Sequence, residues 1–210
     1  MPRAVILDVD GTLVDTNYHH ALCWSRAFRE HGIVIPLWRL HRGVGMGGDK
    51  YVEAMAGADV EKRLGDQLRE RWAALFDALL DEIAPLDGAG ELLRDLKARG
   101  HVVVLASSSI ERHLERFLEV LRAREVVDAW TTKDDVEASK PDPDLVEAAL
   151  DRAGTRDAIL VGDTPWDVKA AQQAGIETIC VLTGGFSEAE LREAGATDVV
   201  ESVAELTGLL

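Results

Sequence analysis

The chain has 210 residues, of which 47% are hydrophobic and 29% are charged, so it is long and apolar enough to bury a sizeable core. Its formal net charge of -15 argues against nucleic acids and anionic membranes as partners, because both require basic protein surface. We therefore expect no nucleic-acid and no membrane partner. The chain starts without a signal-peptide pattern and no apolar run reaches membrane-spanning length, so we expect a cytoplasmic protein.

Several short apolar runs predict buried parallel strands, because continuous rather than alternating apolar residues indicate a strand that is covered on both faces. The runs comprise residues 4–7, 102–106, 158–161 and 178–182, with residues 126–130 as a weaker candidate. Amphipathic helices are predicted between them at residues 91–99, 144–153 and 167–174, each followed by a glycine that ends the helix. This alternation predicts an α/β fold, a Rossmann-like doubly wound parallel sheet.

The alternation of strands and helices is interrupted between about residues 15 and 85. Residues 19–30 have a helical pattern, and residues 66–83 carry apolar side chains at steps of three or four, which is typical of an amphipathic helix. We therefore expect an α-helical cap domain at 15–85, inserted after the first strand of an α/β core domain that comprises 1–14 and 86–210.

Polar side chains follow the predicted strands at the point where each strand ends. In open α/β sheets, ligands bind at the carboxyl ends of the strands, so these side chains are expected to lie together. The candidates are Asp8, Asp10, Ser107, Ser108, Asp163 and Asp167, joined by Lys140 from a loop. Clustered carboxylates repel one another unless a cation neutralises them, and hard oxygen ligands with room for phosphate suit Mg²⁺.

This set of residues predicts phosphoryl chemistry. Asp8, at the strand end, is placed to attack phosphorus and form an aspartyl-phosphate. Asp10, two residues later, is placed to protonate the leaving oxygen and then to deprotonate the attacking water. Lys140 and a metal ion would offset the phosphoryl charge, while Ser107 and Ser108 would hold its oxygens through hydroxyl and N–H groups.

Four motifs at these strand ends carry a family resemblance. They are Asp8-Val9-Asp10-Gly11-Thr12, Leu105-Ala106-Ser107-Ser108-Ser109, Ser139-Lys140-Pro141-Asp142-Pro143 and Val161-Gly162-Asp163-Thr164-Pro165-Trp166-Asp167. In this order they resemble the haloacid dehalogenase superfamily of phosphotransferases, in the branch with a helical cap after the first motif. The resemblance covers essentially the whole chain.

The resemblance implies a role for each motif residue. Asp8 would be the nucleophile and a metal ligand, and Asp10 the acid/base whose backbone carbonyl also binds the metal. Ser107 would bind phosphate, and Lys140 would stabilise the charge of the nucleophile and the phosphate. Asp163 would hold Mg²⁺, the implied cofactor.

Asp167 has two alternative roles under the resemblance, either as a metal ligand through water or as a support for another ligand. The cap supplies the candidates for substrate specificity, which are His20, Arg42 and Lys50. For Arg42 and Lys50 the alternative is surface charge, and for His20 it is a partly buried helix residue. Trp24 and Trp72 are expected to pack in the core of the cap.

We expect hydrolysis of the phosphate monoester of a small metabolite, in the manner of a phosphoglycolate phosphatase, by a monomer or homodimer. The alternative enzyme is a β-phosphoglucomutase-like mutase, which the positions of His20 and Trp24 favour. That group usually has adjacent acidic residues where this chain has Asp163-Thr164. A phospho-receiver-like signalling module is the non-enzymatic alternative, and the inserted cap argues against it.

Overall fold

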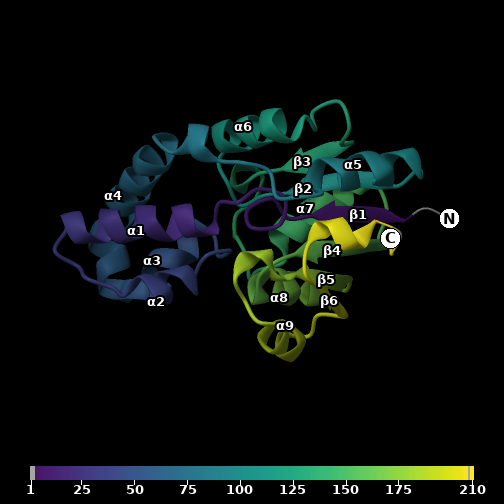
Figure 1. Ribbon diagram of the computed structural model, residues 1–210. Coiled ribbons are helices and arrows are strands. Elements are labelled where there is room, and N and C mark those ends of the chain that lie inside the picture. Colours follow the sequence, from purple (N-terminus) through teal and green to yellow (C-terminus); the bar gives the residue numbers. More distant parts are fainter. Residues whose placement is uncertain (1–2, 208) are drawn as a thin grey trace.

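A parallel sheet forms the centre of the part of the molecule on the right of Figure 1. This computed structural model describes residues 3–207 and 209–210. Within them, six parallel strands are ordered β3-β2-β1-β4-β5-β6. The strands are β1 (Ala4–Leu7), β2 (Val102–Ala106), β3 (Ala129–Thr131), β4 (Ala158–Gly162), β5 (Glu177–Val181) and β6 (Asp198–Val200). Chain order runs outward from β1 in both directions, so the crevice at the carboxyl end of β1 is the topological switch point.

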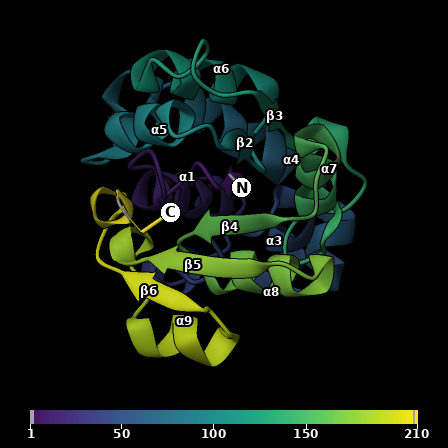
Figure 2. The same cartoon turned by 90° about the vertical axis from the view of Figure 1, so that its right-hand side faces the viewer.

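Both faces of the sheet are covered by helices, which explains why its strands are continuously apolar. In β1, Val5 and Leu7 belong to one hydrophobic cluster, and Ala4 and Ile6 belong to another. The first cluster includes helices α5 (Ala89–Ala98) and α6 (Glu111–Leu121), and the second includes α7 (Asp144–Ala153) and α8 (Pro165–Ala174). Figure 2 shows α5 and α6 together on one side of the sheet, with α9 (Glu188–Ala194) beside β6. The expected Rossmann-like doubly wound sheet is confirmed.

Four helices lie between β1 and α5 and form a separate group on the left of Figure 1. They are α1 (Asn17–Glu30), α2 (Leu37–His41), α3 (Gly48–Ala56) and α4 (Ala58–Asp77). They bury a hydrophobic cluster of their own, in which Trp24, Phe28, Tyr51 and Leu68 are among the largest side chains. The helical insertion therefore has a hydrophobic cluster of its own, which adjoins the first cluster of the sheet through Trp72 and Leu75.

The two segments that join the helical insertion to the sheet run side by side. Val14 forms an antiparallel bridge with Pro85. The Asp15 N–H donates to the Ala84 carbonyl at 3.0 Å, and the Leu86 N–H donates to the Leu13 carbonyl at 2.9 Å. The entry into the insertion and the exit from it are thus held together by backbone hydrogen bonds.

Several element boundaries differ from those expected. The helix predicted at residues 66–83 begins at Ala58 and ends at Asp77, followed by a one-turn 3₁₀ helix, η1 (Leu80–Glu82). Leu79 and Ile83 continue the apolar spacing, but they pack against the sheet domain's core and not within the cluster of the helical insertion. The third strand begins at Ala129, three residues later than expected, and β6 was not predicted because it has only three residues.

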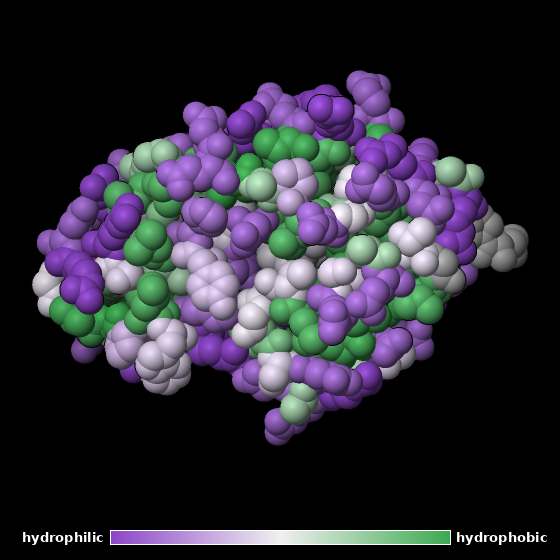
Figure 3. All heavy atoms as spheres, in the orientation of Figure 1, coloured by the Kyte–Doolittle hydropathy of each residue, from purple (hydrophilic) through white to green (hydrophobic). Residues whose placement is uncertain are grey.

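The molecular surface is mixed in polarity. Figure 3 shows hydrophilic side chains spread over both the helical insertion and the sheet domain on the face in view. The most exposed large apolar side chains include Val34, Leu37 and Trp38 of the insertion. Of the helices described, none combines the length and the apolar character needed to cross a bilayer.

Asp77, the last residue of α4, connects the helical insertion to α6 of the sheet domain. Its carboxylate accepts hydrogen bonds from Arg112 Nε at 3.0 Å and Nη2 at 2.9 Å. His113 Nε2 lies 2.7 Å from Asp77 Oδ1, and since a carboxylate only accepts, the imidazole donates from this nitrogen. Hydrogen bonds from Arg112 and His113 lower the pKa of Asp77.

We predict that Asp77→Asn lowers the free energy of unfolding by about 1 kcal/mol at pH 7, because buried His113 loses a charged acceptor. Since the pKa of Asp77 is lowered in the folded state, this stabilisation is complete well above the ordinary value of 3.8 and is lost as the pH falls through the folded-state pKa. Urea unfolding of both proteins between pH 7 and pH 3 measures the difference. Asp81→Asn, at an exposed residue, is the control, and an equal loss in that variant would contradict the prediction.

Candidate active site

Lys140 lies at the centre of the strand-end cluster. Its side chain is 1% exposed, and Nζ lies 2.5 Å from Asp8 Oδ1 and 2.7 Å from Asp167 Oδ1. Burial alone would lower the pKa of Lys140, but the carboxylates of Asp167 and Asp8 raise it above its ordinary value. The ammonium group is therefore charged, and it links the end of β1 to the first turn of α8.

Asp8, directly after β1, is buried against like charges. Burial and the nearby carboxylates of Asp167 and Asp10 raise the pKa of Asp8 to about 7, although Lys140 opposes this shift. One ammonium group is thus insufficient to keep the carboxylate fully ionised at neutral pH. A further cation beside Asp8 would favour the ionised form that a nucleophile requires.

Asp163, at the end of β4, completes a group of three buried carboxylates. Asp8, Asp163 and Asp167 each offer an oxygen atom within 4.8 Å of the other two. Thr12 Oγ1 donates to Asp163 Oδ1 at 3.0 Å, and Asn17 Nδ2 donates to Oδ2 at 2.7 Å. Burial and the charges of Asp167 and Asp8 raise the pKa of Asp163 well above its ordinary value. Such a set of crowded oxygen donors fits a hard divalent cation.

Two glycines make room for the Asp163 carboxylate. A Cβ at Gly184 would lie 1.9 Å from Asp163 Oδ2, and one at Gly11 would lie 2.4 Å from the same atom. Gly11 also has φ +76°, a left-handed conformation that favours glycine. The backbone therefore approaches this carboxylate more closely than any other residue type would allow.

Asp167 participates in both the helix cap and the charge cluster. The Thr164 N–H and Oγ1 donate to Asp167 Oδ2 at 3.0 and 2.6 Å, which forms a capping box at the start of α8. Its other oxygen contacts Lys140. This arrangement places Asp167 in the carboxylate group, with one oxygen committed to the helix.

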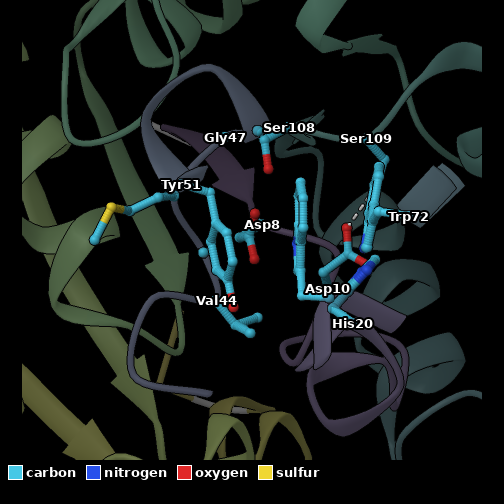
Figure 4. A pocket seen from close by; sticks show the side chains of 13 residues that line it. Asp8, Asp10, His20, Val44, Gly47, Tyr51, Trp72, Ser108 and Ser109 are labelled. Carbon is cyan, nitrogen blue, oxygen red and sulfur yellow. Dashed lines mark hydrogen bonds and ion pairs between the residues drawn. The ribbon is translucent and has the colours of Figure 1, made fainter. Parts of the chain in front are cut away.

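Figure 4 shows the Asp10 side chain beside His20 and Trp72 of the helical insertion, apart from the Asp8 side chain. Thr16 Oγ1 donates to Asp10 Oδ1 at 2.7 Å, Ser109 Oγ donates to Oδ2 at 2.9 Å, and His20 Nε2 lies 2.8 Å from Oδ1. Although burial alone would raise it, His20 and the hydrogen bonds of Thr16 and Ser109 lower the pKa of Asp10 to about 2. Asp8 and Asp10 are two residues apart and differ strongly in acidity.

The three serines after β2 have different positions. Ser108 lines the cavity beside Asp8, as Figure 4 shows. Ser107 is fully buried, accepts a hydrogen bond from the Ser109 N–H at 3.1 Å, and donates more distantly to Asp10 at 3.5 Å. The contact between Ser109 and Asp10 was not predicted. The run of three hydroxyl residues at this strand end already placed Ser109 at the site, but it did not indicate its partner.

Aromatic side chains of the helical insertion form one wall of the cavity above Asp8. Trp24, Tyr51 and Trp72 line it, and the Trp24 ring stacks on the other two at centroid distances of 4.6 and 5.3 Å. The expected packing of Trp24 and Trp72 in the core is therefore only part of their environment. His20 also lines the cavity, with its ring stacked on Phe76 at 4.2 Å.

The other two specificity candidates, Arg42 and Lys50, are not among the residues that line this cavity. Arg42 forms an ion pair with Glu190 of α9, and Lys50 Nζ lies 2.9 Å from Asp142 Oδ2. Both side chains thus connect the helical insertion to the sheet domain. Because both side chains are paired with acidic residues outside this cavity, their positions do not support a direct role in substrate recognition. The sequence alone does not reveal these partners, which lie far along the chain.

The strand-end geometry agrees with the comparisons with known proteins. A family described as haloacid dehalogenase-like hydrolase matches residues 5–181. The validoxylamine A 7'-phosphate phosphatase of Streptomyces hygroscopicus subsp. limoneus is 29% identical over 203 residues, covering 90% of each chain. The phosphoglycolate phosphatase of Nitrosospira multiformis is 28% identical over 219 residues, covering 99% of this chain and 95% of that one.

A comparison with solved structures also identifies a hydrolase as similar to this chain. A hydrolase from Pseudomonas syringae superposes with a TM-score of 0.93 at 30% identity, covering 99% of this chain and 97% of that one. The expected enzyme class, a phosphatase, is confirmed by the family and by the phosphatases among the relatives. Since the matched residues extend from β1 to β5 and include every strand end described above, the chain belongs to the haloacid dehalogenase-like hydrolases.

Proposed function

We propose that this protein is a Mg²⁺-dependent phosphatase that hydrolyses the phosphate monoester of a small metabolite through an aspartyl-phosphate at Asp8. The observation that carries the proposal is the position of Asp8. It contacts Lys140, lies within the group formed with Asp163 and Asp167, and faces a cavity that Asp10 and Ser108 also line. This arrangement supplies a nucleophile, an acid/base and positive charge at one point.

Asp8, Asp163 and Asp167 are the side chains that would hold Mg²⁺, together with the Asp10 backbone carbonyl. The crowding of three buried carboxylates, whose pKa values are raised at Asp8 and Asp163, supports this assignment. A bound Mg²⁺ would supply the positive charge that one lysine does not provide. Lys140 would then orient Asp8 and stabilise the charge of the phosphoryl group.

Two displacements at phosphorus complete the proposed reaction. An Asp8 oxygen attacks phosphorus, the bond to the leaving oxygen breaks, and Asp10 donates a proton to that oxygen. Asp10 then removes a proton from a water molecule, whose oxygen attacks the same phosphorus and releases Asp8 and inorganic phosphate. With its pKa lowered to about 2, Asp10 is ionised at rest, which is the protonation state that the second step requires. The negative charge of a bound phosphate would raise the pKa of Asp10, and this would favour the protonated form that the first step requires.

We assign residues 15–85 to a cap over the α/β core domain of 1–14 and 86–210. The contacts between the two parts support closure of this cap over the strand ends. Asp49 Oδ2 accepts from the Ser139 N–H at 3.3 Å, immediately before Lys140, and His41 Nε2 lies 3.0 Å from the Gly184 carbonyl. Closure would exclude water during attack on phosphorus, and reopening would admit it for the second step.

The substrate is a phosphorylated metabolite whose identity the relatives do not agree on. One relative is named for validoxylamine A 7'-phosphate and another for phosphoglycolate. The match to a phosphoglycolate phosphatase along 99% of this chain supports the expected branch of the family, without extending to that relative's substrate. Both of these relatives are named as phosphatases of a phosphorylated metabolite.

The mutase alternative has one observation in its favour, the contact between His20 and Asp10 beneath Trp24. Incubation with β-glucose 1-phosphate and glucose 1,6-bisphosphate distinguishes the two enzymes. A mutase converts the β-glucose 1-phosphate to glucose 6-phosphate in excess of the bisphosphate supplied and without net release of inorganic phosphate, whereas the proposed phosphatase releases inorganic phosphate.

We predict that Asp8→Asn and Asp10→Asn each abolish Mg²⁺-dependent phosphate release from a panel of phosphorylated metabolites. The first change removes the nucleophile and the second removes the acid/base. Asp151→Asn, at an exposed position of α7, is the matched control and keeps wild-type activity. Unchanged release by Asp8→Asn would refute the mechanism.

We also predict that Mg²⁺ raises the melting temperature of the wild-type protein, because ligand binding to the folded state stabilises it by about 2.7 kcal/mol at 100 times the Kd. Asp163→Asn removes a carboxylate from the proposed site and should lose most of this shift. Differential scanning fluorimetry over a Mg²⁺ titration measures it without any substrate. A full shift in Asp163→Asn, matching that of Asp151→Asn, would exclude Asp163 as a ligand.

A further inference from the structure

A second cavity of about 650 Å³ adjoins the one above Asp8. The two cavities share Gly48, Trp72 and Ser108 in their linings. The larger one, here called the outer cavity, lies between α4 of the helical insertion and residues 133–139 of the sheet domain. It therefore begins at the proposed phosphate site and extends away from the reacting atoms.

The inner cavity is much smaller, about 40 Å³, and Asp8, Asp10 and the aromatic side chains enclose it. It has room for little beyond the phosphoryl group, so the leaving group of a substrate must extend into the outer cavity. Trp72 lies where the two meet. Its side chain lines both cavities, so it separates the proposed phosphate site from the space that a leaving group would occupy.

Acidic side chains outnumber basic ones in the lining of the outer cavity. The acids are Asp49, Glu61, Glu70, Asp77, Asp134 and Glu137, and the bases are Arg69, Arg112 and Lys133. A cavity lined mainly by one sign of charge concentrates that sign of potential, because its low-dielectric walls focus the field.

Two of the three bases are already neutralised within the protein. Arg69 contacts Glu61 at 2.8 Å and also Asp66, while Arg112 pairs with Asp77. Over the part of the chain that the structure describes, Lys133 has no ion pair. Four acidic residues of the lining also form no ion pair within the described residues, namely Asp49, Glu70, Asp134 and Glu137. Lys133 is therefore one unpaired positive charge among four unpaired negative charges. The potential in the outer cavity is therefore negative.

We infer that the outer cavity binds the leaving group of the substrate and selects a neutral or cationic polyhydroxylated alcohol. This inference rests on the proposed phosphatase function. Carboxylates accept hydrogen bonds from hydroxyl and ammonium groups, so the acidic side chains of the lining suit such a leaving group. A leaving group with a carboxylate or a second phosphate would meet like charge. Amino-sugar or sugar phosphates are therefore preferred over bisphosphates and over phosphorylated acids, phosphoglycolate included.

Three substrates of similar size test the inference, since each carries phosphate on a primary alcohol of a six-carbon chain. They are glucosamine 6-phosphate, glucose 6-phosphate and 6-phosphogluconate, which differ in the charge of the leaving group. With Mg²⁺ we expect kcat/KM to fall in that order, by about tenfold or more from first to last, and the ratio to shrink in 1 M NaCl. p-Nitrophenyl phosphate reports hydrolysis independently of this selection.

The double variant Glu70→Lys/Glu137→Lys changes the charge of the cavity at two exposed positions. It should reduce the preference for glucosamine 6-phosphate over 6-phosphogluconate by about tenfold. The matched control is Glu201→Lys/Glu205→Lys, which alters the net charge equally at exposed residues outside the cavity and should keep the wild-type ratio.

The outcomes separate the two proposals. Hydrolysis of p-nitrophenyl phosphate with equal or better use of 6-phosphogluconate would overturn the inferred selection and leave the phosphatase proposal intact. An unchanged substrate ratio in the Glu70→Lys/Glu137→Lys variant would also overturn it. Absence of Mg²⁺-dependent hydrolysis for every substrate, including p-nitrophenyl phosphate, would overturn the proposed function and this inference with it.

Discussion

The contact of one buried ammonium group with two buried carboxylates is the constraint on which the site depends. Lys140 reaches Asp8 at the end of β1 and Asp167 in the first turn of α8, so three distant segments of the chain must meet. Each of these charges would be costly to bury alone. The parallel sheet makes the meeting possible, since it brings the carboxyl ends of β1 and β4 to one edge.

The two aspartates of the first motif show how local surroundings separate chemically identical groups. Asp8 lies among carboxylates, and its pKa is raised to about 7. Asp10 lies among hydrogen-bond donors, and its pKa is lowered to about 2. A carboxyl group that needs added positive charge to ionise fully and one that is ionised at rest thus arise from positions two residues apart. The different partners come from the turn between them, which sends Asp10 toward His20 and Ser109.

The sheet and the chemical residues at its edge could be predicted because both depend on local pattern. Continuous apolar runs mark β1, β2, β4 and β5. Because these strands are parallel, the polar residues that follow them lie at the same edge of the sheet. The end of α4 could not be predicted, because Leu79 and Ile83 keep a helical spacing while packing on a different core. The same limit applies to Arg42 and Lys50, whose acidic partners lie far along the chain.

The paired connections at Val14 and Pro85 have a consequence for how such proteins diversify. The helical insertion leaves and rejoins the sheet domain at adjacent points, and it buries a hydrophobic cluster of its own. Away from Thr16, Asn17 and His20, which contact the strand-end carboxylates, its sequence can therefore change without disturbing the strand register that assembles Asp8, Lys140 and Asp163. The same group of buried charges can in this way be combined with a different cavity lining, because much of that lining comes from the insertion.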